Sequence, residues 1–296
     1  MLFFIYLTER NRNVLTFKYY FSEQNRHVES KTHYNLQRLP MKNAGEYKLL
    51  QDIRGLFKFT GRFFAELLNP PYEHKEFFKQ SYVLGYNSLP LIAITAFILG
   101  LVMTLQSRPV LADFGAESLL PSMVSVSIIR EIGPVVTALI CAGKMASGIG
   151  AELGSMRVTE QIDAMDVSGT NPMKYLVASR VLATTFMLPI LVFFADAVAF
   201  IGSYVAVNIH GEISQTLFLS DAFAPIHYRD VVPSTIKTFF FGFAIGIIGC
   251  YKGFYSESGT ESVGRAANAA VVMSSVAIFS IDLIVVQLQS LELIQI

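Results

Sequence analysis

The chain has 296 residues, of which 52% are hydrophobic and only 16% are charged, and its mean hydropathy is positive. A soluble domain has about 25% charged residues, so this composition indicates a polytopic membrane protein. The formal net charge of zero hides an asymmetry, because 13 of the 23 lysines and arginines lie in residues 1–82. We interpret this excess as a cytoplasmic flank that obeys the positive-inside rule, rather than as a nucleic-acid-binding patch.

The N-terminal part contains no span. Residues 1–48 are polar and lack a clear hydrophobic period, so we expect an extension that is disordered and lies outside the membrane domain of residues 49–296. Met41 is an alternative start, which would make the residues before it an artefact of gene prediction. Over residues 53–68, apolar positions recur on a helical period with basic residues between them. This pattern predicts a basic amphipathic helix in the membrane interface, and a soluble core helix is the alternative.

Five apolar segments follow, each long enough for the ~20 residues with which a helix crosses a bilayer. The first is the clearest, because the 28 residues between Lys79 and Arg108 hold no charge. Each of the other four carries an ionisable residue. The predicted spans cover residues 83–107, 119–143, 176–209, 231–251 and 266–290. The expected fold class is therefore all-α, a polytopic membrane protein with one interfacial helix and five transmembrane helices.

The charges in the connections orient these spans. Basic residues gather in the second and fourth connections, whereas the first and third contain only Arg108 and Arg229 and the C-terminal tail contains none. By the positive-inside rule, the N-terminus and the loop of residues 148–172 are cytoplasmic and the C-terminus is outside. An odd number of spans satisfies this orientation.

Charged residues inside the spans are the first candidates for function, because a charge at mid-bilayer costs about 2.5–3.5 kcal/mol on insertion scales. Arg130 and Glu131 are adjacent, so on a helix they point about 100° apart and cannot fully neutralise each other. We expect Arg130 and Lys237 to hold an anionic headgroup, and Glu131 to orient Arg130 or to meet a cationic headgroup. Alternatively, Arg130 and Lys237 extend to the membrane interface. This alternative is strongest for Lys237, so Lys237→Ala should reduce transport less than Arg130→Ala or Glu131→Ala does.

Two further acids lie in the spans. Asp196 and Asp282 are candidate proton-relay carboxylates, but neither has a second acid nearby in sequence, so the favoured interpretation is a satisfied structural hydrogen bond. Gly242 and Gly246 are spaced by four residues, which predicts close helix packing.

The sequence lacks the motifs of an enzyme. Gly143-Lys144 resembles the end of a phosphate-binding loop, but position 138 is Ala and Met145 follows the lysine. The HExxH and GxSxG motifs are absent, and the five histidines lack metal-ligand spacing. We therefore expect a chain that is not an enzyme and that binds neither a metal nor a cofactor itself.

The second connection holds the other candidate site. Between residues 151 and 167, apolar residues recur at helical spacing among polar positions with an acidic bias, and the run from Ser168 to Pro172 ends the helix. Such a helix rests on the membrane or fills a groove in a soluble partner, and its acidic bias favours a protein partner. Its polar positions include Arg157, Glu160, Gln161 and Asp163.

Residues 130–172, REIGPVVTALICAGKMASGIGAELGSMRVTEQIDAMDVSGTNP, resemble the signature of the MlaE/YrbE-type permeases, the membrane subunits of phospholipid-transporting ABC systems in Gram-negative envelopes and plastids. A looser likeness extends from about Ile53 to Leu291. The resemblance implies an MlaE-type permease fold, a homodimer in the bacterial inner membrane with its C-terminus in the periplasm, and cytoplasmic ATPase subunits that hold the ATP and Mg. It also implies an MCE-domain periplasmic protein that continues the lipid path.

The same resemblance assigns roles to the candidate residues. It implies that residues 151–167 are a coupling helix for the ATPase, with Glu160 and Gln161 in the family's TEQ element. The charged group of the family's lipid cavity falls on the three residues that the insertion cost also selects: Arg130, Glu131 and Lys237.

We therefore expect the permease subunit of an ATP-driven transporter that moves phospholipid between the inner membrane and a periplasmic carrier or the outer membrane, to maintain envelope lipid asymmetry. An ion-coupled secondary transporter that uses Asp196 and Asp282 is the first alternative. A noncatalytic membrane scaffold for a periplasmic protein is the second.

Overall fold

The chain forms two compact units, residues 1–58 and 59–296, and the spans belong to the second. Our computed structural model describes residues 44–68, 73–209, 213–257 and 259–294, and it describes the side chains of all of these except 44–49 and 292–294. The predicted extension of residues 1–48 lies outside the described residues up to position 43. From there the chain forms helix α2 (Ala44–Leu67), which begins earlier than the predicted interfacial helix.

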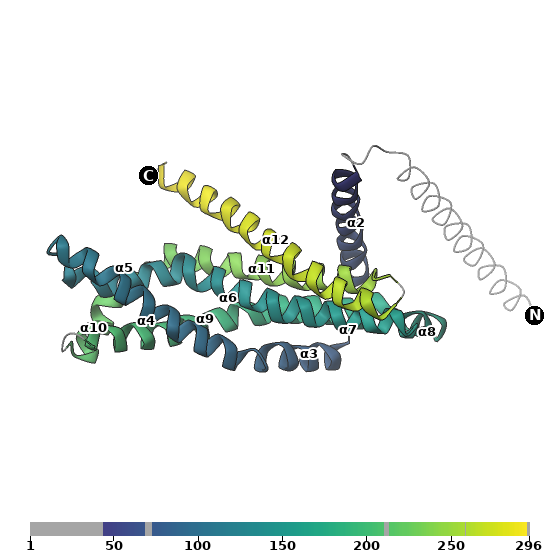
Figure 1. Ribbon diagram of the computed structural model, residues 1–296, viewed down its shortest axis with the longest axis horizontal. Coiled ribbons are helices and arrows are strands. Elements are labelled where there is room, and N and C mark those ends of the chain that lie inside the picture. The colour runs from purple at the N-terminus through teal and green to yellow at the C-terminus, as the bar shows by residue number, and fades with distance from the viewer. Residues whose placement is uncertain (1–43, 69–72, 210–212, 258, 295–296) are drawn as a thin grey trace, which may run out of the picture. The chain divides into compact units, whose positions relative to one another are not determined.

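The predicted all-α class is confirmed for the described residues, in which the regular structure is helical (Figure 1). Five helical segments are long and apolar enough to cross a membrane, as the sequence predicts. They cover His74–Asp113, Glu117–Val158, Met173–Asn208, Tyr228–Phe254 and Thr260–Leu291. Each is longer than its predicted span, because the helices continue past charged residues near the ends of the apolar segments.

The first three spans are assembled from shorter helices. The first contains α3 (His74–Tyr86) and α4 (Leu89–Asp113). The second passes through η1 (Glu117–Leu119), α5 (Leu120–Ser127), η2 (Ile128–Ile132), α6 (Gly133–Cys141), η3 (Ala142–Ala146) and α7 (Ser147–Val158). The third joins η4 (Met173–Ala178) to α9 (Ser179–Asn208). The segments η2, η3 and η4 are π-helical turns, a rare conformation that is frequent at functional sites.

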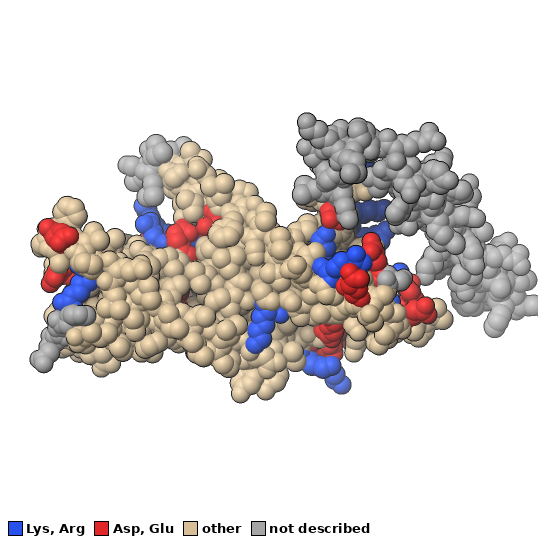
Figure 2. All heavy atoms as spheres, viewed as in Figure 1, with Lys and Arg blue, Asp and Glu red and all other residues tan. Residues whose placement is uncertain are grey.

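The remaining helices are α8, α10, α11 and α12. Helix α8 (Gln161–Val167) lies between the second and third spans, and α10 (Gln215–Phe223) lies between the third and fourth. The fourth and fifth spans are α11 (Tyr228–Phe254) and α12 (Thr260–Ile294). Helix α7 packs against both of them, and Figure 1 shows the second span running alongside α11. Most of the face that Figure 2 shows along the spans is uncharged, as a membrane environment requires.

Helix α9 is central to the packing, because it contacts α3, α4, α6 and α11. Small residues let its backbone approach its neighbours closely. A Cβ atom at Gly100 of α4 would overlap the carbonyl oxygen of Ala199, and one at Gly202 of α9 would overlap that of Phe97. The sites of closest contact between α4 and α9 therefore admit only glycine.

The close packing predicted for Gly242 and Gly246 is also present. These residues of α11 lie against α9, where a Cβ at Gly242 would come within 2.5 Å of the carbonyl oxygen of Thr184 and one at Gly246 would overlap the Thr184 side chain. Within the second unit, the end of α2 packs on α11 through aromatic side chains. Phe59 is buried, and its ring centroid lies 5.6 Å from that of Tyr251.

The α4–α9 contact gives a test of this packing. Gly202→Ala should destabilise the protein by about 1–3 kcal/mol, because the added methyl group forces the two backbones apart. Gly143→Ala is the matched control, since a Cβ at Gly143 meets no atom within 4 Å. Thermal unfolding of both variants in detergent should show a lower melting temperature for Gly202→Ala alone. Equal melting temperatures would contradict the contact.

Candidate functional site

A cluster of three charged side chains joins the second, fourth and fifth spans. Lys237 of α11 is completely buried, and its Nζ donates to Oε2 of Glu131 at 2.7 Å and to Oδ1 of Asp282 at 2.9 Å. The side chain of Glu131 is 40% exposed and that of Asp282 is 19% exposed. The ammonium group therefore lies inside the bundle, and the two carboxylates connect it to the surface. When both acids are ionised, this Lys237 cluster carries one excess negative charge.

The Lys237 cluster bears on two expectations from the sequence. Lys237 does not extend to the membrane interface, because the surrounding helices enclose its stem and two carboxylates hold its ammonium group. Asp282 has the structural hydrogen bond that the favoured interpretation expects, and this bond to Lys237 is also an ion pair. Its partner lies on another helix, and the distance along the chain hides this pairing from sequence reasoning.

Arg130 does not join the Lys237 cluster. Its Nε lies 2.8 Å from Oδ1 of Asp230 in an ion pair, and its side chain is 46% exposed. Arg130 and Glu131 therefore contact different residues of the same helix α11, as side chains that point in different directions must. Arg130, Glu131 and Lys237 therefore belong to two groups of contacts, the Lys237 cluster and the Arg130–Asp230 pair. Their role around a lipid headgroup stays a prediction. Sequence reasoning missed Asp230, although it lies two helical turns before Lys237.

The local backbone at these charges is the π-helical turn η2, which contains both Arg130 and Glu131. Gly133 follows this turn, and a Cβ there would overlap Oδ1 of Asp196 on α9. Within the described residues, this buried oxygen has no hydrogen-bond partner. Asp196 thus packs against the second span, whereas Asp282 pairs with Lys237. The structure does not bring together the two carboxylates that a proton relay would use.

The predicted coupling helix of residues 151–167 is divided into two helices. Helix α7 ends at Val158, Glu160 has a left-handed backbone with φ of 58°, and α8 follows. A residue with a Cβ seldom adopts this conformation, so it marks a specific turn. The ion pair between Nη1 of Arg157 and Oδ1 of Asp163, at 2.5 Å, connects the two helices across it. Glu160 and Gln161 are exposed at the turn, and Figure 1 shows α8 at the end of the second span.

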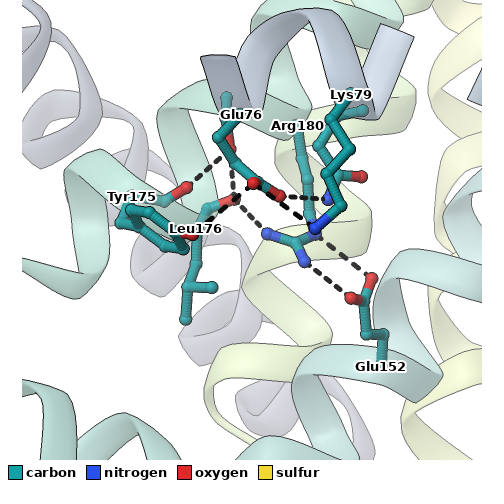
Figure 3. A network of polar contacts seen from close by, with 8 residues as sticks. Glu76, Lys79, Glu152, Tyr175, Leu176 and Arg180 are labelled. Atoms are coloured by element: carbon teal, nitrogen blue, oxygen red, sulfur yellow. Dashed lines mark hydrogen bonds and ion pairs between the residues drawn. The ribbon is translucent and has the colours of Figure 1, made fainter. Parts of the chain in front are cut away.

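A second polar network connects α7 to α9 near this turn (Figure 3). The Arg180 side chain is only 3% exposed. Its Nη2 and Nε donate to the two carboxylate oxygens of Glu152 at 2.8 and 3.3 Å, and its Nη1 donates to the carbonyl oxygen of Leu176 at 2.9 Å. A bidentate pair of this kind fixes the orientation of both side chains. Sequence reasoning missed this role of Arg180, because its partner Glu152 lies 28 residues away along the chain.

Helix α3 contributes to the same region. The buried Glu76 accepts hydrogen bonds from Nε2 of Gln80 at 2.8 Å and from the Tyr175 hydroxyl at 3.5 Å. Figure 3 shows the side chains of Glu76, Arg180 and Glu152 pointing toward one another from three helices. This end of the bundle is therefore held together by charged hydrogen bonds. Among the described residues, no group of three or more His, Cys, Asp or Glu side chains is arranged to hold a metal ion.

Comparison with known proteins identifies relatives over most of the chain. Residues 77–288 match the family model described as permease MlaE. A probable ABC transporter permease protein of Rickettsia typhi is 35% identical over 254 residues, which cover 86% of this chain and 97% of that protein. A probable ABC transporter permease protein of Synechocystis is 35% identical over 229 residues, which cover 77% of this chain and 87% of that protein.

A third relative carries a more specific name. The intermembrane phospholipid transport system permease protein MlaE of Haemophilus influenzae is 32% identical over 236 residues, which cover 77% of this chain and 90% of that protein.

The burial of Lys237 predicts that its substitution destabilises the fold more than substitution of Arg130 does. Lys237→Met leaves Glu131 and Asp282 without their cation. Breaking a fully buried ion pair in this way costs about 3–5 kcal/mol, and the cost here is smaller because the two carboxylates are 40% and 19% exposed. Arg130→Met should cost less, because the side chain of Arg130 is 46% exposed and water or lipid headgroups can reach Asp230. Thermal unfolding in detergent should therefore rank Lys237→Met as the less stable variant. The opposite ranking would show that Lys237 is not enclosed.

Proposed function

Since the chain belongs to the MlaE family of ABC transporter permeases, we propose that it is the membrane subunit of an ATP-driven phospholipid transporter. Subunits of this class are not catalytic themselves, and membership implies a separate ATPase chain. ATP and Mg bind to that partner, and this chain binds no cofactor of its own. The observation that carries the proposal is the Lys237 cluster inside the spans of a chain with a relative that is named for phospholipid transport.

The charges in the spans are suited to a zwitterionic or anionic headgroup. Glu131 is partly exposed, and its carboxylate accepts hydrogen bonds from cationic groups. The guanidinium of Arg130 binds phosphate through several N–H donors at once. The buried Lys237 holds Glu131 in place rather than contacting the cargo. This arrangement refines the predicted cavity: Arg130 and Glu131 meet the headgroup, and Lys237 positions one of them.

ATPase movement reaches the spans through α8 and α7. Glu160 and Gln161 at the turn between these helices dock on the ATPase, and the Arg157–Asp163 ion pair keeps the turn rigid. The Glu152–Arg180 pair then connects α7 to α9. Because α7 is joined to η2 through η3 and α6 of the same span, a displacement of the turn at Glu160 also moves the segment that carries Arg130 and Glu131.

Helix α12 supports a homodimer. Apolar side chains at helical spacing are exposed along it, which is the pattern of a surface that a second helix covers. They include Val272, Val276, Phe279 and Leu283, with exposures of 58%, 62%, 55% and 62%. The basic connections support a cytoplasmic N-terminus and a periplasmic C-terminus in the bacterial inner membrane. An MCE-domain protein on the periplasmic side then exchanges lipid with the dimer.

The two alternatives have less support. A secondary transporter would use Asp196 and Asp282, but these acids contact different residues. A scaffold has no need of a buried lysine and its two carboxylates, which are costly to place in a membrane.

The proposal is tested by reconstituting the chain with its ATPase in phospholipid vesicles. The parental complex should transfer labelled phospholipid to acceptor vesicles only when ATP is present. Glu160→Lys combined with Gln161→Lys should abolish both ATPase co-purification and transfer, because a reversed charge in a small docking contact is repulsive as well as unpaired.

Glu160→Gly is the matched control, because glycine adopts the left-handed backbone of this position and introduces no positive charge. It should retain more ATPase than the double lysine variant. Undiminished ATPase binding by the lysine variant would place the docking contact elsewhere. ATP hydrolysis by an intact parental complex without phospholipid transfer would contradict the proposed cargo.

A further inference from the structure

A cavity of about 410 Å³ lies between α9, α10 and α11, apart from the Lys237 cluster. Its volume is within the range of about 300–1,000 Å³ that is typical of ligand sites. It occupies the end of the spans that carries α10. Ser125 of α5 fixes the α10 wall, because its hydroxyl donates to the carbonyl oxygen of Ala222 at 2.6 Å.

The lining of this cavity is suited to hydrocarbon. It is mainly aromatic and aliphatic, with Pro189, Phe193, Phe200, Phe218 and Phe223 among the lining residues. The hydroxyls of Ser234 and Thr235 on α11 donate to the backbone of their own helix, at 3.0 and 2.8 Å. Asp196 is the one acidic or basic residue in the lining, and it turns Oδ1 against Gly133. Tyr204 and Gln215 add polar groups at two positions of the lining. The rest of the lining offers water few partners, whereas an apolar chain needs none.

The mouth of the cavity opens on the surface of the spans. Ile201 and Phe223 line the cavity and are 57% and 51% exposed. Apolar side chains that are exposed at this position contact the hydrocarbon of the bilayer. An occupant therefore enters sideways from the membrane, which makes an acyl chain the natural ligand.

A cation lies beside this apolar site. Ile129 and Val231 line the cavity, and their neighbours in sequence are Arg130 and Asp230, which form an ion pair. The ion pair is measured at Nε of Arg130, and within the described residues the two terminal amino groups donate no hydrogen bond. Guanidinium groups with open donors bind phosphate strongly. A positive group beside an apolar cavity matches the phosphate and one tail of a phospholipid.

We propose that this cavity is a lateral phospholipid site, which holds one acyl chain between α9, α10 and α11 while Arg130 binds the phosphate. The choice of phospholipid rests on the proposed function, and the site deepens it by adding a place for the tail. The adjacent residues of η2 then face two ways, with Arg130 toward the lipid in this site and Glu131 toward Lys237. Arg130 and Glu131 are consecutive residues, so lipid bound at Arg130 lies beside the segment that carries Glu131 of the Lys237 cluster. From there it moves toward that cluster.

The test is photo-crosslinking of the full chain in vesicles of phosphatidylethanolamine and phosphatidylglycerol. p-Benzoylphenylalanine replaces Phe200, which lines the cavity, or Phe194, which is 36% exposed on the same helix and is not part of the lining. Mass spectrometry should find several times more captured phospholipid at position 200. Arg130→Gln should lower this capture about tenfold, the effect of losing one charged hydrogen bond, and should leave capture at position 194 unchanged.

A second part of the experiment fills the cavity by substitution. Ser234→Phe places a ring inside the cavity, and Ala197→Phe fills it from the exposed side if the first variant does not fold. Both should reduce capture at position 200 only. Equal capture at positions 200 and 194, or capture at 200 that neither Arg130→Gln nor filling reduces, would show ordinary contact with bilayer lipid and overturn the site. Capture as expected without ATP-dependent transfer would instead refute the proposed function and leave the site standing.

Discussion

A lysine ammonium group inside a membrane protein must have an opposite charge beside it, and the rest of the bundle is arranged around this requirement. Lys237 has no exposed surface and contacts carboxylates from the second and fifth spans. These contacts set the rotation of α11 about its axis. Asp230, two turns earlier on the same helix, then faces Arg130. One buried charge thus determines where the other charged side chains of the spans can lie.

Two kinds of contact hold the bundle together. Near the docking turn, Arg180 and Glu152 connect helices through bidentate hydrogen bonds. Along α9, glycine contacts bring backbones together, as Gly202 does against Phe97. Charged pairs are directional, so they can pass a displacement from one helix to the next. Glycine contacts are not directional, and they let the helices stay packed during such a displacement. This division is consistent with a permease that moves in response to a separate ATPase.

The sequence predicts the spans well because hydropathy needs no knowledge of partners. It also identifies Arg130, Glu131 and Lys237 as candidate functional residues, because a charge in a span costs free energy in any orientation. It does not predict the pairings, which depend on the rotation and tilt of each helix. Asp230 lies one residue before the predicted fourth span and was therefore overlooked. The break at Glu160 was missed because a positive φ in a residue with a Cβ leaves no sequence signal.

The most direct test of this account is a double-mutant cycle on Lys237 and Glu131. Lys237→Met, Glu131→Gln and the double variant are compared by their free energies of unfolding in detergent. If the ion pair organises the bundle, the double variant should be less destabilised than the sum of the single variants by about 1–3 kcal/mol. Additive effects would show that the two side chains do not depend on each other, and would contradict the central role of the Lys237 cluster.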